Sequence, residues 1–326
     1  MRRQIWIVVL CLIAVDGIAL AQMPVGTSGQ VGPLADAQLV KRLEVTKPGL
    51  YENLIVDGDG ASGNLVKITA DNVTIRNCEV RNGRGNAIGV FGTKVVIENC
   101  RIHHMLAGSF QEQQDAHGIS GRWGDVTIRN CDISYTSGDA IQFDPDRKSS
   151  GIVVIENCRL WTGPLPEASG GYRAGERPGE NGVDTKTKPD GPRCQLKVRN
   201  CFLYGWNQPS PISNNAALNL KENVDAEITG CVFDDNEIAL RVRGPGERGG
   251  AHVIISDCAI FRAKVAIRAE DKLEILQMNR IAYGSGVAQR IQFVNGKPGA
   301  GYKNENEQAA VPLEVLLRRG FDVSSK

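Results

Sequence analysis

The sequence has little of what several functional classes require. Lysine and arginine number 38 and aspartate and glutamate 37, so the formal net charge is only +1. Without an excess of basic residues, nothing in the composition favours nucleic acid as a partner. Histidines number four, and neither histidine nor Cys-x-x-Cys spacing accompanies the cysteines, which argues against a zinc site. Aromatic residues are also few, whereas glycine is abundant.

A comfortable membrane-spanning run is missing as well. The apolar stretch over residues 5–15 is too short to cross a bilayer, and Asp16 follows it. Basic residues precede this stretch, and small residues at Ala19 and Ala21 follow it, which is typical of a secretory signal cut after Ala21. We therefore expect residues 1–21 to be a signal peptide. The mature protein is then secreted, periplasmic or on the cell surface, without stable membrane insertion; an N-terminal membrane anchor is the alternative.

What the sequence does contain is a repeat. The segment VTIRNCEV at residues 73–80 returns as VVIENCRI, VTIRNCDI, VVIENCRL and LKVRNCFL, with looser copies AEITGCVF and VIISDCAI. Within the first copy, Val73 and Ile75 share one parity, whereas Cys78 and Val80 share the other. Because a strand points alternate side chains to opposite faces, this switch predicts a bend at the asparagine that keeps the apolar side inward.

Asparagine suits such a bend because it tolerates left-handed backbone angles, and cysteine behaves as a small buried hydrophobe. We expect the asparagines to stack at one corner of the molecule, with the cysteines beside them facing inward. The asparagines are Asn77, Asn99, Asn130, Asn157 and Asn200, and the cysteines are Cys78, Cys100, Cys131, Cys158, Cys201, Cys231 and Cys258.

The cysteines of the mature chain number eight, which in an exported protein would usually suggest disulfides. Stacked strands lie about 4.8 Å apart, but parallel side chains do not naturally adopt the ~90° dihedral angle of a disulfide. We therefore expect mostly reduced, buried thiols. Cys194 stands apart from the repeat, and no partner for it can be identified.

A third apolar segment completes each unit. It consists of a small residue followed by an aliphatic one, and we call these aliphatic residues anchors: Val66, Ile88, Ile119, Ile141, Val183, Leu218, Leu240 and Ile267. Three short strands per unit with recurring bends indicate a solenoid. The pattern resembles the right-handed parallel β-helix of the pectate lyase superfamily, including its stacked asparagine ladder.

This resemblance implies an all-β fold, a single-stranded right-handed parallel β-helix of eight or more turns over residues 50–270. We expect an N-terminal segment over 22–49 and a C-terminal segment over 271–326. Amphipathic patterns predict short capping helices at 33–43 and 311–321. Residues 302–308 have the composition of a solvated linker.

Function is expected on the outer face, because the inner face is used for packing. If each anchor points inward, the next residue and the third residue along point outward. Stacked turns then place these residues in two columns, with Arg122 one turn before a polar patch. We expect this patch to contain Gln142, Asp144, Asp184, Lys186, Asn219, Lys221, Arg241 and Arg243.

Three long connections, at 103–116, 161–180 and 204–215, lead into the strands that carry this patch. Long loops in a compact fold are often functional. Their aromatic residues either line a cleft and stack on sugar rings or pin the loops to the coil. These residues are Trp161, Tyr172, Tyr204 and Trp206.

A basic row beside carboxylates suits an acidic polysaccharide as partner. We expect the substrate to be held by Arg122, Gln142, Asn219 and Arg241, and Ca²⁺ to be bound through the oxygens of Asp139, Asp144, Asp146 and Asp184. Cleavage of a uronic acid polymer by β-elimination requires a base that removes the C5 proton. Lys186 is the first candidate, because like charge from neighbouring Lys221 favours its neutral amine. Lys221 and Arg243 are the next candidates.

Two short motifs add to the resemblance. ENGVDTKT at 180–187 is similar to the strand that carries the catalytic lysine of some calcium-dependent pectate lyases, with Lys186 at the matching place. GDAIQFDPD at 138–146 resembles an acidic metal-holding turn of that group and also a signature of mannuronan epimerases, in which Asp146 stands where histidine is expected. The resemblance implies a polysaccharide lyase, which we expect to be a monomer.

Two other functional classes stay open. A glycoside hydrolase or an epimerase on the same fold would need two carboxylates that bracket a sugar, and Asp144 and Asp184 are the nearest candidates. A noncatalytic carbohydrate-binding protein is the other alternative, because any solvated face of a β-helix carries charged residues.

Overall fold

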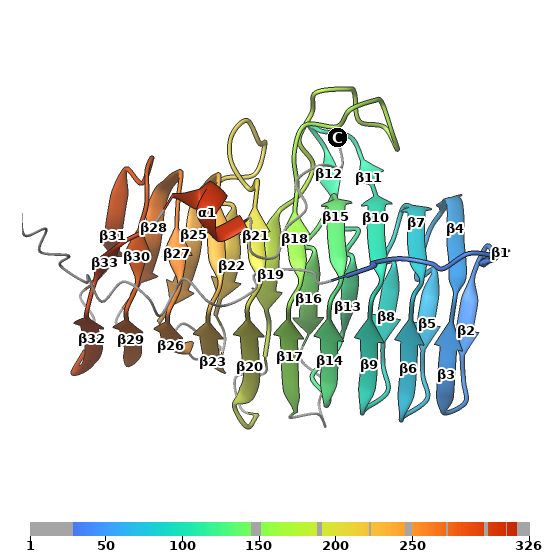
Figure 1. Ribbon diagram of the computed structural model, residues 1–326, viewed down its shortest axis with the longest axis horizontal. Helices are drawn as coiled ribbons and strands as arrows, with labels where there is room; N and C mark the ends of the chain where they lie inside the picture. Colours follow the sequence, from blue (N-terminus) through green and yellow to red (C-terminus); the bar gives the residue numbers. More distant parts are fainter. Residues whose placement is uncertain are drawn as a thin grey trace, which may run out of the picture.

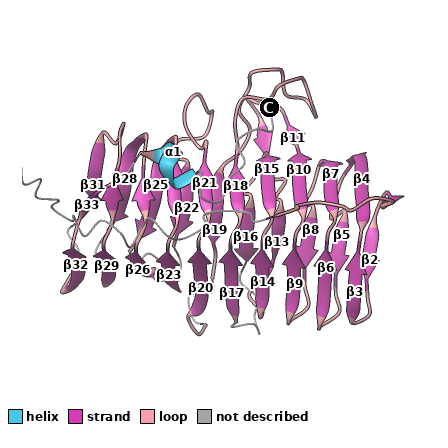
Figure 2. Ribbon diagram, viewed as in Figure 1, coloured by secondary structure: helices cyan, strands magenta, loops and turns pink. Residues whose placement is uncertain are grey.

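The computed structural model describes residues 29–144, 151–187, 191–221, 223–244, 250–271, 273–296, 299–310 and 312–317. The chain winds into a coil whose turns each contribute one strand to each of three long parallel sheets (Figure 1). Strands make up nearly all of the regular structure, and the described residues contain a single helix (Figure 2). The expected all-β, right-handed parallel β-helix is confirmed. Two of its long sheets have ten strands each, and the third has eleven.

We name the three long sheets A, B and C. Sheet A contains β1 (Gln38–Val40), β4 (Leu54–Ala61), β7 (Glu79–Gly83), β10 (Arg101–Met105), β15 (Asp132–Thr136), β18 (Arg159–Trp161), β21 (Phe202–Tyr204), β24 (Val232–Asp234), β27 (Ala259–Ile260), β30 (Ala282–Tyr283) and β33 (Gln308–Ala309).

Sheet B contains β2 (Leu43–Val45), β5 (Val66–Ile68), β8 (Ile88–Val90), β13 (Ile119–Arg122), β16 (Ile141–Asp144), β19 (Asn181–Thr185), β22 (Ala216–Leu220), β25 (Asn236–Arg243), β28 (Ala263–Glu270) and β31 (Gln289–Val294).

Sheet C contains β3 (Gly49–Glu52), β6 (Val73–Arg76), β9 (Val95–Glu98), β14 (Val126–Arg129), β17 (Ile152–Glu156), β20 (Cys194–Arg199), β23 (Val224–Thr229), β26 (His252–Ser256), β29 (Ile275–Asn279) and β32 (Gly301–Glu305). A small antiparallel pair, β11 (Ala107–Gly108) and β12 (Gln113–Gln114), lies in a loop between β10 and β13.

The asparagine corner between sheets C and A is confirmed. All five asparagines have positive φ angles between 51° and 54°. The side chain of Asn99 donates to Asn77 Oδ1 at 3.1 Å, and that of Asn130 donates to Asn99 Oδ1 at 2.6 Å. In the two looser copies, Gly230 and Asp257 also have positive φ angles. The corner therefore uses residues that tolerate the left-handed conformation.

The cysteine prediction is also confirmed. The seven ladder cysteines are buried in the main core, and all eight cysteines of the described residues are free thiols. Each ladder thiol lies near a backbone carbonyl, as Cys100 Sγ does at 3.2 Å from the carbonyl of Glu98. Cys194 is likewise buried and free. Parallel stacking leaves the thiols side by side along the axis.

The register of sheet B matches the predicted anchors. Val66 lies opposite Ile88, which lies opposite Ile119, and the series continues in order to Leu240 and Ile267. All eight anchors are buried. The two outward columns of sheet B follow directly from this register.

Two predictions about the ends are wrong. Residues 33–43, expected as a helix, form β1 and the start of β2, because residues 38–40 find a parallel partner in β4. Residues 302–308, expected as a linker, belong largely to β32 and β33, which add a further turn. The coil thus spans residues 38–309 rather than 50–270. The expected signal peptide over residues 1–21 lies outside the described residues.

The C-terminal helix is confirmed as α1 (Leu313–Leu317). It packs on the outer face of sheet A, where Leu316 joins a cluster that includes Phe202 and Phe261, rather than capping the open end of the coil. The physical reason is a row of apolar side chains that sheet A turns outward at this point and that needs cover. Within the described residues, no helix is long and apolar enough to span a membrane.

Candidate active site

The outer face of sheet B carries the predicted polar patch. Gln142 lies opposite Asp184, Asp184 opposite Asn219, and Asn219 opposite Arg241. Lys186 and Lys221 follow the last residues of β19 and β22 and continue the second column. The structure therefore places the predicted patch residues side by side, although neighbouring side chains cover several of them.

Lys186, Lys221 and Asp184 form what we call the lysine centre. The Nζ atom of Lys221 lies 3.3 Å from Asp184 Oδ2, and that of Lys186 lies 4.0 Å from the same oxygen. Asp184 is only 2% exposed. Burial raises the pKa of Asp184 to about 6, although the two lysines act in the opposite direction. Both amines therefore share one buried acid.

Hydrogen bonds fix the backbone of both lysines. The hydroxyl of Thr185 donates to the carbonyl of Lys221 and accepts from its backbone N–H, both at 2.8 Å. The indole N–H of Trp123 donates to the carbonyl of Lys186 at 2.6 Å. These contacts tie the lysines to neighbouring turns of the coil at the point where the strands end.

The expected depressed pKa of Lys186 is wrong. Burial lowers the pKa of Lys186, but the carboxylates of Asp184, Asp144, Asp139 and Asp115 outweigh burial and raise that pKa above its usual value. The like charge of Lys221 is outweighed, because carboxylates on three turns of the coil face Lys186. Lys186 is therefore held in its protonated form.

A buried polar layer lies at the corner where the chain enters sheet B. Asp139 is fully buried, accepts a hydrogen bond from the side chain of Asn181 at 2.9 Å, and donates its backbone N–H to His117 Nδ1 at 2.9 Å. Burial, with the charges of Asp184 and Glu180, raises the pKa of Asp139 well above its usual value. Because Nδ1 of His117 accepts a hydrogen bond, the neutral ring carries its proton on Nε2.

Sequence reasoning missed His117 and Glu180 as members of this site. Burial raises the pKa of Glu180 and lowers that of His117. His117, Asp139 and Asn181 each lie two residues before an anchor. This shared spacing forms a third column of stacked residues, and it is the signal in the sequence by which His117 could have been found. The column lies inside the corner rather than on the outer face.

One or two turns further along the coil, three arginines surround a single carboxylate. Arg241 binds both oxygens of Glu270, at 2.8 and 3.1 Å. Arg243 Nε lies 3.2 Å and Arg268 Nε 2.8 Å from the same carboxylate. Burial alone would raise the pKa of Glu270, but the arginines hold it below its usual value. We call Arg241, Arg243, Arg268 and Glu270 the arginine centre.

The remaining polar candidates lie in the predicted columns. Gln142 donates to Asp144 Oδ1 at 3.0 Å, and Asn219 is buried between the turns that carry Asp184 and Arg241. Arg122 lies at the opposite edge of the patch, with its guanidinium 5.6 Å from the ring centre of Phe91. Arg122 is therefore separated from the arginine centre by several turns.

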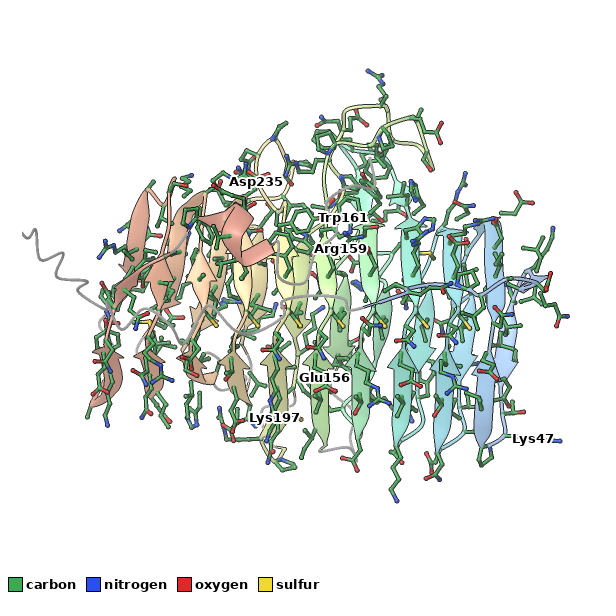
Figure 3. All side chains as sticks on the ribbon, in the orientation of Figure 1. Lys47, Glu156, Arg159, Trp161, Lys197 and Asp235 are labelled. Carbon is green, nitrogen blue, oxygen red and sulfur yellow. The ribbon has the colours of Figure 1, made fainter. Side chains whose placement is uncertain are left out.

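The loop aromatics do not line a sugar-binding cleft on this patch. Tyr172 and Trp206 are each 2% exposed; Tyr172 packs with Leu106 and Leu165, and Trp206 joins the main core. Trp161, labelled in Figure 3, and Tyr204 belong to sheet A. Their rings are nearly parallel, with centres 5.6 Å apart. Because these two rings stack face to face along the coil, the faces that meet cannot also stack on a sugar ring. The second alternative, that the aromatics pin the loops, describes them better.

The candidate calcium ligands are dispersed in the part of the structure that is described. Asp139 is bound to Asn181, and Asp184 is paired with two lysines. Among the described residues, no group of three or more acidic, histidine or cysteine side chains is arranged to hold a metal ion. Asp144 is the last residue of β16, and Asp146 lies outside the described residues. Calcium binding stays a prediction.

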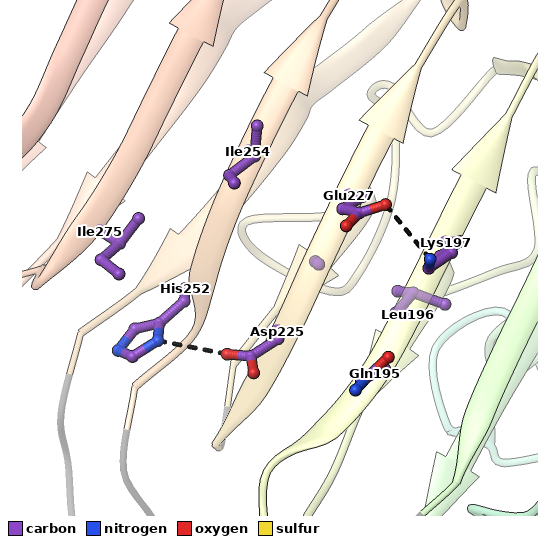
Figure 4. Close-up of a pocket in the computed structure, with 9 residues that line it drawn as sticks. Gln195, Leu196, Lys197, Asp225, Glu227, His252, Ile254 and Ile275 are labelled. Atoms are coloured by element: carbon purple, nitrogen blue, oxygen red, sulfur yellow. Dashed lines mark ion pairs between the residues drawn. The ribbon is translucent and has the colours of Figure 1, made fainter.

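A shallow groove of about 330 Å³ lies elsewhere, on the outer face of sheet C (Figure 4). Its polar side chains pair with one another: His252 Nδ1 lies 3.2 Å from Asp225, and Lys197 Nζ lies 3.5 Å from Glu227. Because these charges are already compensated, we favour the patch on sheet B as the functional site.

Comparison with known proteins supports the fold. Residues 52–175 match the family model described as the right-handed beta helix region. An alginate lyase from Paenibacillus sp. str. FPU-7 superimposes with a TM-score of 0.51 and 17% identity, covering 83% of this chain and 87% of its own. Pectate lyase Pel9A superimposes with a TM-score of 0.49 and 14% identity, covering 88% and 74%. No curated protein matches the sequence.

Proposed function

We propose that this right-handed parallel β-helix protein is a polysaccharide lyase that cleaves a uronic acid polymer by β-elimination. The observation that carries the proposal is the pair of lysine amines over buried Asp184, with the arginine centre beginning on the next turn. Lysines can transfer the protons of an elimination, and arginine forks match carboxylates. The likeness in fold to an alginate lyase is consistent with this chemistry.

In the proposed reaction, the two lysines have different roles. Lys221 accepts the C5 proton of the uronate, the electrons of the C5–H bond form the C4–C5 double bond, and the bond between C4 and the glycosidic oxygen breaks. Lys186 donates a proton to the leaving oxygen. Lys186 suits the acid because the surrounding carboxylates keep it protonated, and this protonation removes it from the role of base. Lys221 is the other amine of the lysine centre; its Nζ atom lies 3.3 Å from Asp184 Oδ2, so it can act as the base only after it has lost its own proton.

The C5 proton is acidic enough to remove only when the neighbouring carboxylate is neutralised. Arg241 lies on the turn next to Lys221 and can bind that carboxylate, and Gln142 and Asn219 offer hydrogen bonds to sugar hydroxyls. Preorganised cations of this kind stabilise the charge that develops in the transition state.

The test is the ultraviolet absorbance of unsaturated uronates on a panel of pectin, alginate and glycosaminoglycans. We expect one of these polymers to yield product, and Lys221→Ala to lower turnover by about two to four orders of magnitude, the range of a lost general base. Lys197→Ala is the matched control, because Lys197 is paired with Glu227 on sheet C. Absence of unsaturated product from every polymer would overturn the proposal.

The same assay separates elimination from hydrolysis. A hydrolase needs a carboxylate that reaches the sugar, but Asp184 is buried beneath two lysines. New reducing ends without ultraviolet absorbance would indicate hydrolysis instead.

We propose Ca²⁺ as a further cation at the acidic turn that begins at Asp144, and no step above depends on it. A chelator should then lower the melting temperature, because a ligand that binds only the folded state stabilises it. Asp144→Asn should remove this sensitivity. Identical melting with calcium and with chelator would count against the site.

A further inference from the structure

The arginine centre carries more positive charge than its own carboxylate balances. Arg241, Arg243 and Arg268 contribute three positive charges and Glu270 one negative charge, which leaves an excess of two. Their side chains are 18%, 39% and 21% exposed, and that of Glu270 is 8% exposed. Because like charges at short range repel and partial burial strengthens the repulsion, this arrangement favours an added anion.

The hydrogen bonding of the centre points the same way. Arg241 uses two nitrogens on Glu270 and saturates both carboxylate oxygens. The Nε atoms of Arg243 and Arg268 come close to Glu270, but they are buried and have no aligned hydrogen-bond acceptor among the described residues. Buried donors of charged groups without acceptors are costly. Arg268 has one further hydrogen-bond partner, since its guanidinium donates to Asn214 Oδ1 at 2.7 Å.

The position of the centre relative to Lys221 fixes what it can bind. Lys221 follows β22, Arg241 and Arg243 end β25, and Arg268 lies near the end of β28. Successive turns are about 4.8 Å apart, so Arg268 lies roughly 10 Å from Lys221 along the coil axis. A polymer that runs along this axis would place a different sugar unit at each centre, because a pyranose unit is about as long as one turn is high.

We propose that Arg243 and Arg268, held by Glu270, form a binding subsite for the carboxylate of a uronate unit one or two positions away from the cleaved bond. The proposal rests on the proposed function for the direction of the polymer and for the identity of the anion. With this subsite, the arginine centre adds affinity only for charged chains that are long enough to reach it, so longer oligouronates bind more tightly than a disaccharide.

The test uses defined oligouronates of the polymer that the parent protein cleaves, or of polygalacturonate and alginate if none is cleaved. Binding is measured by calorimetry in a Lys221→Ala background. We expect Arg268→Gln to weaken binding of a hexasaccharide by roughly tenfold or more, the range for a lost hydrogen bond to a charged group. Binding of a disaccharide should change little. Arg243→Gln should reproduce the pattern if Arg268→Gln does not fold.

Arg129→Gln on sheet C is the matched control, because Arg129 binds Glu98 on a face remote from the patch. Hexasaccharide binding by Arg268→Gln equal to that of this control would overturn the subsite, even if the parent protein is a lyase. Binding that depends on Arg268 without any unsaturated product would support the subsite and overturn the lyase. A dependence on Arg268 for a sulfated neutral polymer but not for oligouronates would overturn the assignment to carboxylate.

Discussion

The carboxylate of Asp184 illustrates how burial and pairing compete at a single residue. Two lysines face it, yet removal from water dominates and its pKa is raised to about 6. A raised pKa means that the folded protein binds this proton more tightly than the unfolded chain does. The contribution of Asp184 to stability therefore falls as the pH rises from about 4 to about 6, and it is constant above that window.

We expect Asp184→Asn to remove this pH dependence. The shift from 3.8 to about 6 corresponds to up to about 3 kcal/mol. Urea unfolding of the parent and of Asp184→Asn at several pH values across the window would measure it. Asp139 has a pKa shifted in the same direction, so the parent minus variant difference is the quantity to compare. A difference that does not change with pH would contradict the assignment.

The two lysines of the lysine centre should respond differently to arginine. Arginine is effectively always protonated, so it cannot accept the C5 proton, whereas it preserves the positive charge at the position of the acid. We expect Lys221→Arg to be as inactive as Lys221→Ala, and Lys186→Arg to retain at least about tenfold more activity than Lys221→Arg. The ratio of kcat values measures this. The opposite order would exchange the two roles.

At the scale of elements, the asparagine corner combines a backbone requirement with a side-chain ladder. Asn99 has a φ of 54°, donates to Asn77 and accepts from Asn130. Gly230 occupies the same corner in another turn and meets only the backbone requirement. The two contributions can therefore be separated by substitution.

Asn99→Gly should cost roughly 1–3 kcal/mol through the two lost hydrogen bonds. Asn99→Ala should cost about 1–2 kcal/mol more, because alanine must also adopt a left-handed conformation. Chemical denaturation would give the order parent, glycine, alanine from most to least stable. Equal stability of the two variants would show that the backbone requirement is weak.

Helix α1 is an element whose role is cover rather than closure of the coil. Leu316 and its neighbours shield outward apolar residues of sheet A that include Phe202 and Phe261. We expect a chain that ends at Ala310 to remain a β-helix but to bind a hydrophobic dye more strongly than the full chain. Its activity should persist, because the patch lies on sheet B. Unchanged dye binding would mean that the helix is not needed as cover.

For the whole molecule, stability comes from stacked turns and not from cross-links. The buried core runs the length of the coil, and each turn contacts its neighbours as in other solenoids. The eight cysteines of the described residues contribute to this core as thiols. Export into an oxidising compartment would therefore leave the fold independent of disulfides.

We expect the melting temperature to be the same with and without a reductant. Titration with a thiol reagent should detect the eight cysteines between Cys78 and Cys258 in denaturant, with Cys11 in addition if residues 1–21 are still present, and almost none of these eight in the folded protein, because they are buried. Fewer reactive thiols under denaturing, non-reducing conditions would reveal a disulfide and contradict the ladder of free thiols.

The sequence by itself determined the repeat, the corner and the outward columns of sheet B. These features depend on the alternation of side chains along a strand and on which residues tolerate a bend, and both are local properties. The anchors from Val66 to Ile267 stack in the predicted order for this reason. Local pattern fails at residues 33–43: their spacing of apolar residues predicts a helix, but residues 38–40 pair instead with a parallel strand, β4, that follows later in the sequence.

Only the tertiary structure decided the electrostatics of the patch and the place of the loop aromatics. The pKa of Lys186 depends on carboxylates contributed by three successive turns, from Asp115 to Asp184, and their distances cannot be read from spacing in the sequence. Trp161 is the last residue of β18 in sheet A, where it lies opposite Tyr204 of β21 with the two rings nearly parallel. Burial, charge and stacking act through space, so they are fixed only when the turns are packed together.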